Sequence, residues 1–199
     1  MIGRRSLIAA ALVLTGAPAL ARQAAPETPL ATARPNIVVF LADDLGYLDI
    51  SPTGDRNARS PNLARLSSES LSFDQAFVAS PACAPSRAAL LTGLMPARNG
   101  AEANHDRANA AIRKLPSYLQ AQGYQVVSFG KVAHYEQTLS YGFDHAANYT
   151  YHDDSAVYNA IKWLKERTDK RPLALFIGSN WPHVPWPASS DGIDADSLT

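Results

Sequence analysis

Cysteine is nearly absent from this sequence, because Cys83 is the only one among 199 residues. A single thiol cannot form an internal disulfide, which excludes a small domain held together by its own disulfide bridges. An excess of either charge is also lacking: 18 Lys and Arg balance 18 Asp and Glu, so bulk charge favours no nucleic-acid partner. The apolar run of residues 7–14 is far shorter than the roughly 20 residues of a membrane-spanning helix, so no stable membrane span is expected.

Residues 1–21, MIGRRSLIAAALVLTGAPALA, combine paired arginines, this short apolar run and the ending Ala19-Leu20-Ala21. That order is typical of a signal peptide with an A-x-A cleavage site, and it predicts a periplasmic or secreted protein. A membrane anchor is the disfavoured alternative. The arginine pair also permits twin-arginine export, so the export route stays open. In an oxidising compartment, Cys83 is either a free thiol or a residue that has been chemically altered.

With 46% hydrophobic residues, the chain has the composition of a globular protein. Residues 22–34, rich in Ala, Pro and Thr, are predicted to be a flexible lead-in. Apolar runs predict strands at residues 36–42, 124–130 and 172–178, the first buried on both faces of a parallel sheet.

Helix-start signals lie between these predicted strands. Helices are predicted to begin at Pro61, at Pro116 and at Asp154 or Ser155, the last with Val157, Ile161 and Leu164 on one face. Alternating strands and helices indicate an α/β sheet covered by helices, in which ligands collect at the carboxyl ends of the strands.

Two adjacent acids, Asp43 and Asp44, follow the first predicted strand. Neighbouring carboxylates repel each other, so a protein either exposes both to water or places a cation between them. The residues alone leave a solvated loop and half of a metal site as alternatives. The metal site remains an alternative because the two acids follow an apolar strand directly, where ligands of such sheets bind.

Cys83 lies in the stretch SPACAPSRAALLTG, residues 80–93. Pro85 is predicted to be the first residue of a helix that ends at Gly93, with Arg87 in its first turns. The positive end of the helix dipole would then stabilise a negative charge on the Cys83 side chain. The alternative is a small buried cysteine with a packing role.

The stretch C-A-P-S-R resembles the C-x-P-S-R signature of the type I sulfatases, and the likeness extends over residues 35–187. PNIVVFLADDLGY resembles the opening strand and metal-binding acids of that family. SPNLARLSSESLSFDQAF resembles its next helix and strand, LPSYLQAQGYQVVSFGK a helix-strand unit ending in lysine, and NWPHVPW its Pro-His-x-Pro loop. The resemblance implies an alkaline-phosphatase-like fold, with a sheet of mainly parallel strands and helices on both faces. Residues 35–199 would be the N-terminal, incomplete part of the catalytic domain.

The resemblance also implies a fate for Cys83. In this family the motif cysteine is converted to formylglycine by a formylglycine-generating or sulfatase-maturating enzyme, which reads Pro85 and Arg87. The hydrated aldehyde has two hydroxyls: one attacks the sulfur of the substrate and displaces the alcohol, and deprotonation of the other expels sulfate.

The other residues carried over by the resemblance surround this nucleophile. Asp43, Asp44 and Cys83 would hold Ca²⁺; Arg87 and Lys131 would bind the diol and sulfate oxygens; and His134 and His183 would act in proton transfer or sulfate binding. The alternatives are a solvated strand end for Lys131 and a structural role for His183. The spacing GKVAH resembles the iduronate-2-sulfatase branch, and LTGLMPARNG the sulfamidase branch. His105 stays outside the set, and Asp191, Asp194 and Asp196 are interpreted as a solvated acidic end.

The resulting hypothesis is a Ca²⁺-dependent sulfatase that hydrolyses sulfate esters or N-sulfates of a sulfated glycan or small molecule. A phosphate or phosphonate monoester hydrolase of the same superfamily is one alternative, because the same site can serve phosphoryl transfer. A catalytically inactive protein that binds sulfated glycans is the other.

Overall fold

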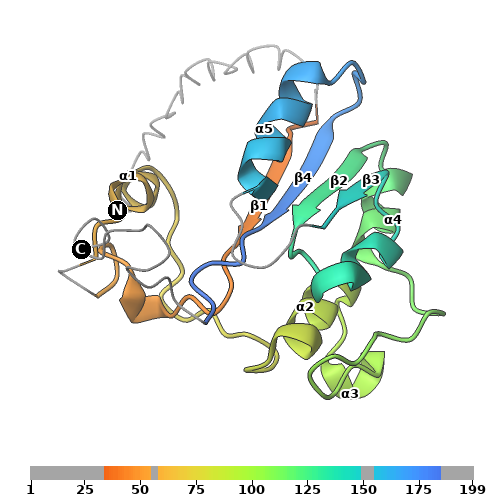
Figure 1. Cartoon of the computed structure of the whole chain (residues 1–199), viewed down its shortest axis with the longest axis horizontal. Helices are drawn as coiled ribbons and strands as arrows, with labels where there is room; N and C mark the ends of the chain where they lie inside the picture. Colours follow the sequence, from red (N-terminus) through yellow and green to blue (C-terminus); the bar gives the residue numbers. More distant parts are fainter. Residues whose placement is uncertain (1–33, 55–57, 149–154, 185–199) are drawn as a thin grey trace, which may run out of the picture. The chain divides into compact units, whose positions relative to one another are not determined.

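The structure is a computed structural model, and it describes residues 34–54, 58–148 and 155–184 (Figure 1). The predicted signal peptide, nearly all of the predicted lead-in, and Asp191, Asp194 and Asp196 lie outside these residues. The described strands form one sheet in the order β1-β4-β2-β3, and every neighbouring pair is parallel. They are β1 (Ile37–Leu41), β2 (Gln125–Gly130), β3 (His145–Ala147) and β4 (Leu173–Gly178). The predicted α/β class with a parallel sheet is confirmed.

Helices and short 3-10 turns connect the strands. They are η1 (Tyr47–Asp49), α1 (Pro61–Glu69), α2 (Cys83–Thr92), α3 (Pro96–Asn99), α4 (Leu115–Ala121), η2 (Tyr135–Ser140) and α5 (Ser155–Glu166). The predicted start of α1 at Pro61 is confirmed, and α4 begins at Leu115, one residue before the predicted Pro116. A proline occupies the first turn of each helix, where its missing amide breaks no hydrogen bond. No helix among the described residues has both the length and the apolar character needed to cross a membrane.

Each face of the sheet is covered by helices. On one face, Leu91 of α2 and two leucines of α4 pack against Val126 and Phe176. On the other, α5 packs against the alternate residues of β2 and β4, among them Val127 and Leu175. Successive residues of a strand point to opposite faces, so one apolar run supplies both layers of the core. The expected helices on both faces are therefore present.

The predicted burial of β1 on both faces is wrong. β1 lies at the edge of the described sheet, and Val38 and Phe40 are 64% and 57% exposed. Of the three residues predicted to share one face of α5, Val157 packs against the core, whereas Ile161 and Leu164 are exposed. The helix presents two small residues, Ala156 and Ala160, to the sheet, and the partly buried Val157 and Trp163 pack beside them. Alanines allow the helix to approach β2 and β4 closely, and a hydrophobicity pattern gives them too little weight.

Candidate active site at the carboxyl ends of the strands

The ends of β2 and β4 approach so closely that a side chain does not fit at either glycine. A Cβ on Gly130 would lie 2.1 Å from the carbonyl oxygen of Gly178, and one on Gly178 would lie 2.2 Å from the carbonyl carbon of Lys131. Gly130 also has a φ of 77°, in the left-handed region that favours glycine. The approach allows the Lys131 amide to donate a hydrogen bond of 2.9 Å to the Gly178 carbonyl. It fixes the start of the loop that carries Lys131 and His134.

Asp43 follows β1 at the same edge of the sheet and is 2% exposed. Nη2 of Arg87 donates a 2.8 Å hydrogen bond to Oδ1, and Nζ of Lys131 forms a second buried ion pair with Oδ2. Burial by itself raises the pKa of Asp43, but the hydrogen bond from Lys131 and the charges of Arg87 and Lys131 outweigh it and hold the pKa below its usual range. Asp43 is therefore a buried carboxylate between two cations.

Asp44 turns the chain immediately after Asp43. Its φ of 60° lies in the left-handed region, which aspartate tolerates better than most residues. Adjacent residues of an extended chain point in opposite directions, so this turn explains how both carboxylates reach one sulfur atom. Oδ1 of Asp43 lies 3.7 Å, and Oδ1 of Asp44 3.9 Å, from Sγ of Cys83. The structure thus brings the two predicted metal acids and the predicted nucleophile together.

Cys83 is the first residue of α2. The sequence prediction that Pro85 begins this helix is wrong, because proline is tolerated throughout the first turn, where amides have no intrahelical partner. The predicted end is confirmed, since Gly93 closes the helix in the left-handed conformation. One of the first-turn amides, that of Ala84, donates a 3.2 Å hydrogen bond to Oδ1 of Asn104. The loop that contains Asn104 therefore braces the start of the helix at the nucleophile position.

The expected stabilisation of a negative charge on Cys83 is not found for the thiol itself. Burial raises the pKa of Cys83, and the negative charges of Asp43 and Asp44 add to this effect. The positive charges of Lys131 and Arg87 act in the opposite direction but do not overcome it. Cys83 therefore stays protonated in these surroundings and is a weak nucleophile as a thiol.

Lys131 and Arg87 form the positive side of the site. Nζ of Lys131 lies 3.7 Å from Sγ of Cys83 and 4.4 Å from the centre of the Tyr135 ring. The side chain is fully buried, so the alternative of a solvated strand end is wrong. Arg87, also buried, donates from Nη1 to the carbonyl of Lys131 as well as from Nη2 to Asp43. Arg87 therefore holds Asp43 and the Lys131 backbone in place.

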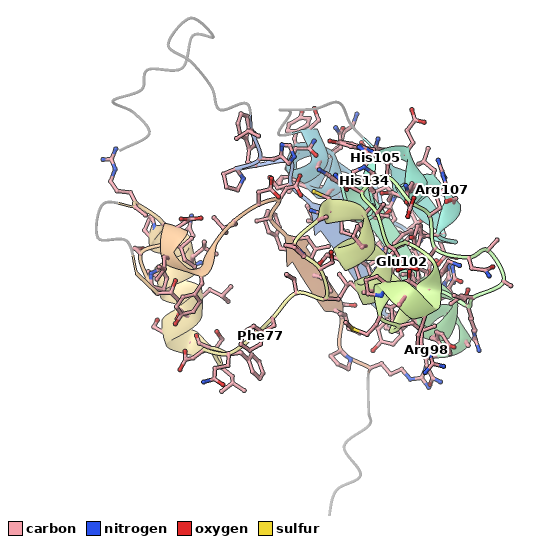
Figure 2. The ribbon with its side chains drawn as sticks, turned by 90° about the horizontal axis from the view of Figure 1, so that it is seen from below. Phe77, Arg98, Glu102, His105, Arg107 and His134 are labelled. Atoms are coloured by element: carbon pink, nitrogen blue, oxygen red, sulfur yellow. The ribbon has the colours of Figure 1, made fainter. Side chains whose placement is uncertain are left out.

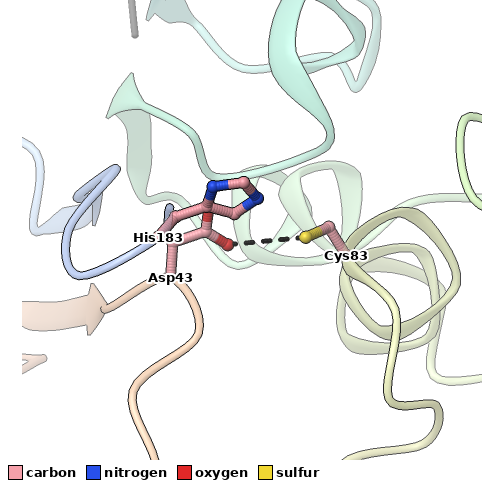
Figure 3. A group of neighbouring side chains, drawn as sticks. All are labelled: Asp43, Cys83 and His183. Carbon is pink, nitrogen blue, oxygen red and sulfur yellow. Dashed lines mark hydrogen bonds between the residues drawn. The ribbon is translucent and has the colours of Figure 1, made fainter. Parts of the chain in front are cut away.

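His183 comes from the loop after β4 and lies near Asp43 and Cys83 (Figure 3). Its Nε2 is 3.5 Å from Oδ2 of Asp44. One donor atom each from Asp43, Cys83 and His183 lie within 4.8 Å of one another, which is close enough for a single metal ion to contact all three. Sulfur, nitrogen and oxygen together suit Zn²⁺, whereas oxygen donors alone suit Ca²⁺. The residues present therefore fit a divalent cation, and oxygen in place of sulfur at position 83 would make the set less favourable for Zn²⁺ and more favourable for Ca²⁺.

His134 contacts another histidine. Its Nε2 is 2.8 Å from Nδ1 of His105, and the side chain is 4% exposed. Burial lowers the pKa of His134 to about 4, with the positive charge of Lys131 as the next contribution. His134 is therefore neutral at physiological pH.

Sequence reasoning found most side chains around Cys83 but missed those that support them. The sequence did not single out Tyr135, whose ring lies near the Lys131 ammonium, or Asn104, which accepts a hydrogen bond at the start of α2. His105 was kept outside the set of predicted site residues, although it contacts His134. The stretch NHD at residues 104–106 was a usable signal, because it clusters three polar residues shortly after the nucleophile helix.

The sulfatase family profile matches residues 35–196, which is nearly the whole span that follows the predicted lead-in. This chain belongs to the sulfatase family. It is 32% identical to the ulvan-active sulfatase of Formosa agariphila over 173 residues, covering 79% of this chain and 33% of that protein. It is 37% identical to the N-acetylgalactosamine-6-sulfatase of Homo sapiens over 127 residues, covering 55% of this chain and 24% of that protein.

A solved structure has the same fold. A protein in complex with its substrate D-glucosamine-2-N,6-O-disulfate superimposes with a TM-score of 0.67 and 25% identity, covering 77% of this sulfatase chain and 36% of that protein. The sulfatase chain therefore spans about a third or less of the length of these relatives. Such neighbours confirm the alkaline-phosphatase-like fold class predicted from the sequence motifs.

Proposed function

We propose that this sulfatase chain carries the nucleophile side of a site that hydrolyses sulfate esters. The observation that carries the proposal is the position of Cys83, within 4 Å of Asp43, Asp44 and Lys131 at the start of a helix. A substrate sulfate placed there meets a nucleophile position, a buried cation and two acids that can hold a metal. These are the parts that attack on a negatively charged sulfate group requires.

The reactive form of residue 83 in this proposal is formylglycine, made by a maturation enzyme that recognises Cys83, Pro85 and Arg87. The raised pKa of the thiol supports this, because the unmodified cysteine is poorly suited to attack. A hydrated aldehyde supplies two hydroxyls at the same position, one to attack sulfur and one to release sulfate. Asp44 and Lys131 lie close enough to Sγ to contact a hydroxyl that replaces it.

Asp43 and Asp44 would hold Ca²⁺ together with the oxygen of residue 83. The cation, when bound, would neutralise charge on the sulfate and lower the pKa of the attacking hydroxyl. Asp43 is held for this task by Arg87 and Lys131, which fix both of its oxygens. The role expected for Arg87 therefore changes from a direct sulfate contact to orientation of a metal ligand.

Of the remaining functional side chains, one would supply positive charge and two would take part in proton transfer. Lys131, a buried cation 3.7 Å from Sγ, would bind a sulfate oxygen as negative charge develops. His134, neutral because its pKa is about 4, would accept a proton from a hydroxyl of residue 83. His183, beside Asp44 at the exposed side of the site, would donate a proton to the departing alcohol oxygen or bind sulfate.

The substrate in this proposal is a sulfated sugar. Its support comes from the relatives, of which one is named for N-acetylgalactosamine-6-sulfate chemistry and another was solved with a sulfated glucosamine. Residues 1–21, as a signal peptide, would deliver the enzyme to the periplasm or the medium, where such glycans occur. N-terminal sequencing of the protein recovered from the periplasm tests this, with cleavage after Ala21 expected.

A substrate panel on the natural-length protein tests the reaction. Sulfatase turnover should exceed turnover of the matching aryl phosphate, and Cys83→Ala should abolish it. Dominant phosphatase turnover would assign the site to phosphoryl transfer instead, and binding of sulfated glycan without turnover would indicate an inactive binding protein. Mass spectrometry of the peptide containing residue 83 should show a loss of about 18 Da relative to cysteine, from replacement of the thiol by an aldehyde.

A further inference from the structure

We infer that His105 is a positioning residue for His134, which it holds in the tautomer whose Nε2 carries the hydrogen. Figure 2 shows the two histidines side by side although they lie 29 positions apart in the sequence. The inference rests on the proposed function only in giving His134 a part in proton transfer. The contact itself does not depend on that part.

The contact between the two rings has the geometry of a hydrogen bond. Nε2 of His134 and Nδ1 of His105 are 2.8 Å apart, and the rings meet edge to face with an interplanar angle of 69°. One nitrogen must donate and the other accept, because two lone pairs or two hydrogens would repel each other at this distance. The pair therefore couples the tautomer of one ring to that of the other.

Hydrogen bonds from neighbouring residues hold the backbone of His105 in its conformation. Its φ of 78° lies in the left-handed region, which is unfavourable for a side chain of this size. Buried Gln137 holds the backbone there by donating from Nε2 to the carbonyls of His105 at 3.1 Å and Asp106 at 3.2 Å. A carboxylate oxygen of Asp106 in turn accepts a 2.7 Å hydrogen bond from the amide of Ala103. Such a conformation persists where the surroundings specify it.

The tautomer follows from the other nitrogen of His134. Nδ1 is buried and has no hydrogen-bond partner among the residues that the structure describes. A hydrogen on Nδ1 would be a buried donor without an acceptor, which is rare in folded proteins. A lone pair on Nδ1 leaves an unpartnered acceptor, which is the smaller penalty. Nε2–H of His134 then donates to Nδ1 of His105.

This tautomer makes Nδ1 of His134 the atom that takes a proton. A proton that reaches His134 would be taken by that lone pair, forming an imidazolium whose Nε2–H remains bonded to His105. The same loop also braces the nucleophile helix, because Asn104, next to His105, accepts the hydrogen bond from the Ala84 amide. Adjacent residues of one loop thus position the proposed base and the start of α2.

Two substitutions separate the hydrogen bond from the backbone conformation. His105→Gly removes the ring and tolerates a φ of 78°, while His105→Asn also tolerates it and keeps a polar atom near the place of Nδ1. His145→Gln is the matched control, because His145 is exposed on β3 and its ring stacks on Trp163. Circular dichroism and thermal unfolding confirm that each variant is folded.

Nitrogen-15 NMR of histidine-labelled, natural-length protein at neutral pH reads the tautomer without requiring turnover. The His134 signals are assigned by their loss in His134→Gln. We expect a single tautomer with hydrogen on Nε2 in the unsubstituted protein and in His145→Gln, and a mixture in His105→Gly. An Nδ1–H tautomer, or a His134 spectrum unchanged in His105→Gly, overturns the inference.

Kinetics test the consequence for catalysis. His105→Gly should lower kcat by about 10- to 100-fold, the range found when partners of a functional histidine are removed, with little change in KM. His105→Asn should recover part of this loss, and His145→Gln should match the unsubstituted enzyme. Unchanged kcat in His105→Gly overturns the inference. Absence of sulfatase turnover in the unsubstituted, matured protein would instead refute the proposed function, and the NMR spectra would still decide the role of His105.

Discussion

The carbonyl carbon of Lys131 lies against Cα of Gly178, so that a methyl group on Gly178 would stand 2.2 Å from it. Real Cβ atoms do not approach backbone atoms so closely, and neither strand end can move without breaking the hydrogen bond between the Lys131 amide and the Gly178 carbonyl. The close packing of two strand ends therefore determines where the buried lysine of the site lies.

Gly178→Ala should destabilise the fold by about 1–3 kcal/mol, the usual range for overpacking a buried position. It should also lower turnover more than a loss of stability explains, because Lys131 must move away from Cys83. Urea unfolding and steady-state kinetics measure the two effects. The control is Gly142→Ala, where nothing lies within 4 Å of the added Cβ and only the positive φ adds strain. Equal effects of the two substitutions on turnover would contradict the argument.

Asp43→Asn should be among the most destabilising single changes at this site. It leaves the buried cations of Lys131 and Arg87 without their shared carboxylate, and breaking a buried ion pair in this way costs about 3–5 kcal/mol. Asp44→Asn is the matched control: its carboxylate is exposed, so the free energy of unfolding should change by less than about 1 kcal/mol. Chemical denaturation at neutral pH compares the two. A similar loss in both variants would show that the buried ion pairs do not stabilise the fold.

The buried histidine predicts how stability depends on pH. The pKa of His134 falls from 6.5 in the unfolded chain to about 4 in the fold, so between these values the unfolded state binds the extra proton. Stability should therefore decrease as pH falls from about 6.5 to about 4, by on the order of 3 kcal/mol. Urea titrations across this window measure the slope. His134→Gln should flatten it, and an equally steep slope in that variant would assign the effect to other groups.

Much of this arrangement is predictable from local patterns. Apolar runs located β1, β2 and β4, and prolines located the starts of α1 and α4, because the signal for each lies within a few residues. The side chains around Cys83 follow from motifs at strand ends, which a parallel sheet gathers at one edge. The contact between His105 and His134 was not predictable, since it depends on a left-handed residue held by distant Gln137.

The exposure of β1 could not be predicted from the sequence either. The run at residues 37–41 has the composition of a central strand, and only the position of α5 over β2 and β4 shows that one face of β1 is uncovered in the described structure. Composition reports what a strand can bury and not what covers it.

The uncovered face of β1 predicts self-association of the 199-residue chain. Val38 and Phe40 form an apolar strip on an edge strand, and such edges favour pairing between copies. Phe40→Ser should raise the concentration at which oligomers appear in sedimentation velocity. Phe73→Ser is the control, because Phe73 is even more exposed than Phe40 but lies outside the sheet. The same shift in both variants would point to general hydrophobicity rather than the strand edge.

The donor atoms around residue 83 predict a change of metal preference on maturation. With cysteine at this position, Asp43, Cys83 and His183 offer oxygen, sulfur and nitrogen within 4.8 Å, and this set favours Zn²⁺ over Ca²⁺. With formylglycine, oxygen replaces the sulfur and leaves two oxygen donors and the His183 nitrogen, so the affinity for Zn²⁺ should fall relative to that for Ca²⁺. Calorimetry on the two forms measures both affinities. Cys83→Ser should weaken Zn²⁺ binding by at least about 10-fold, as expected when a ligand rather than its neighbour is lost. Equal Zn²⁺ affinity in the cysteine and serine forms would show that the sulfur does not contact the ion.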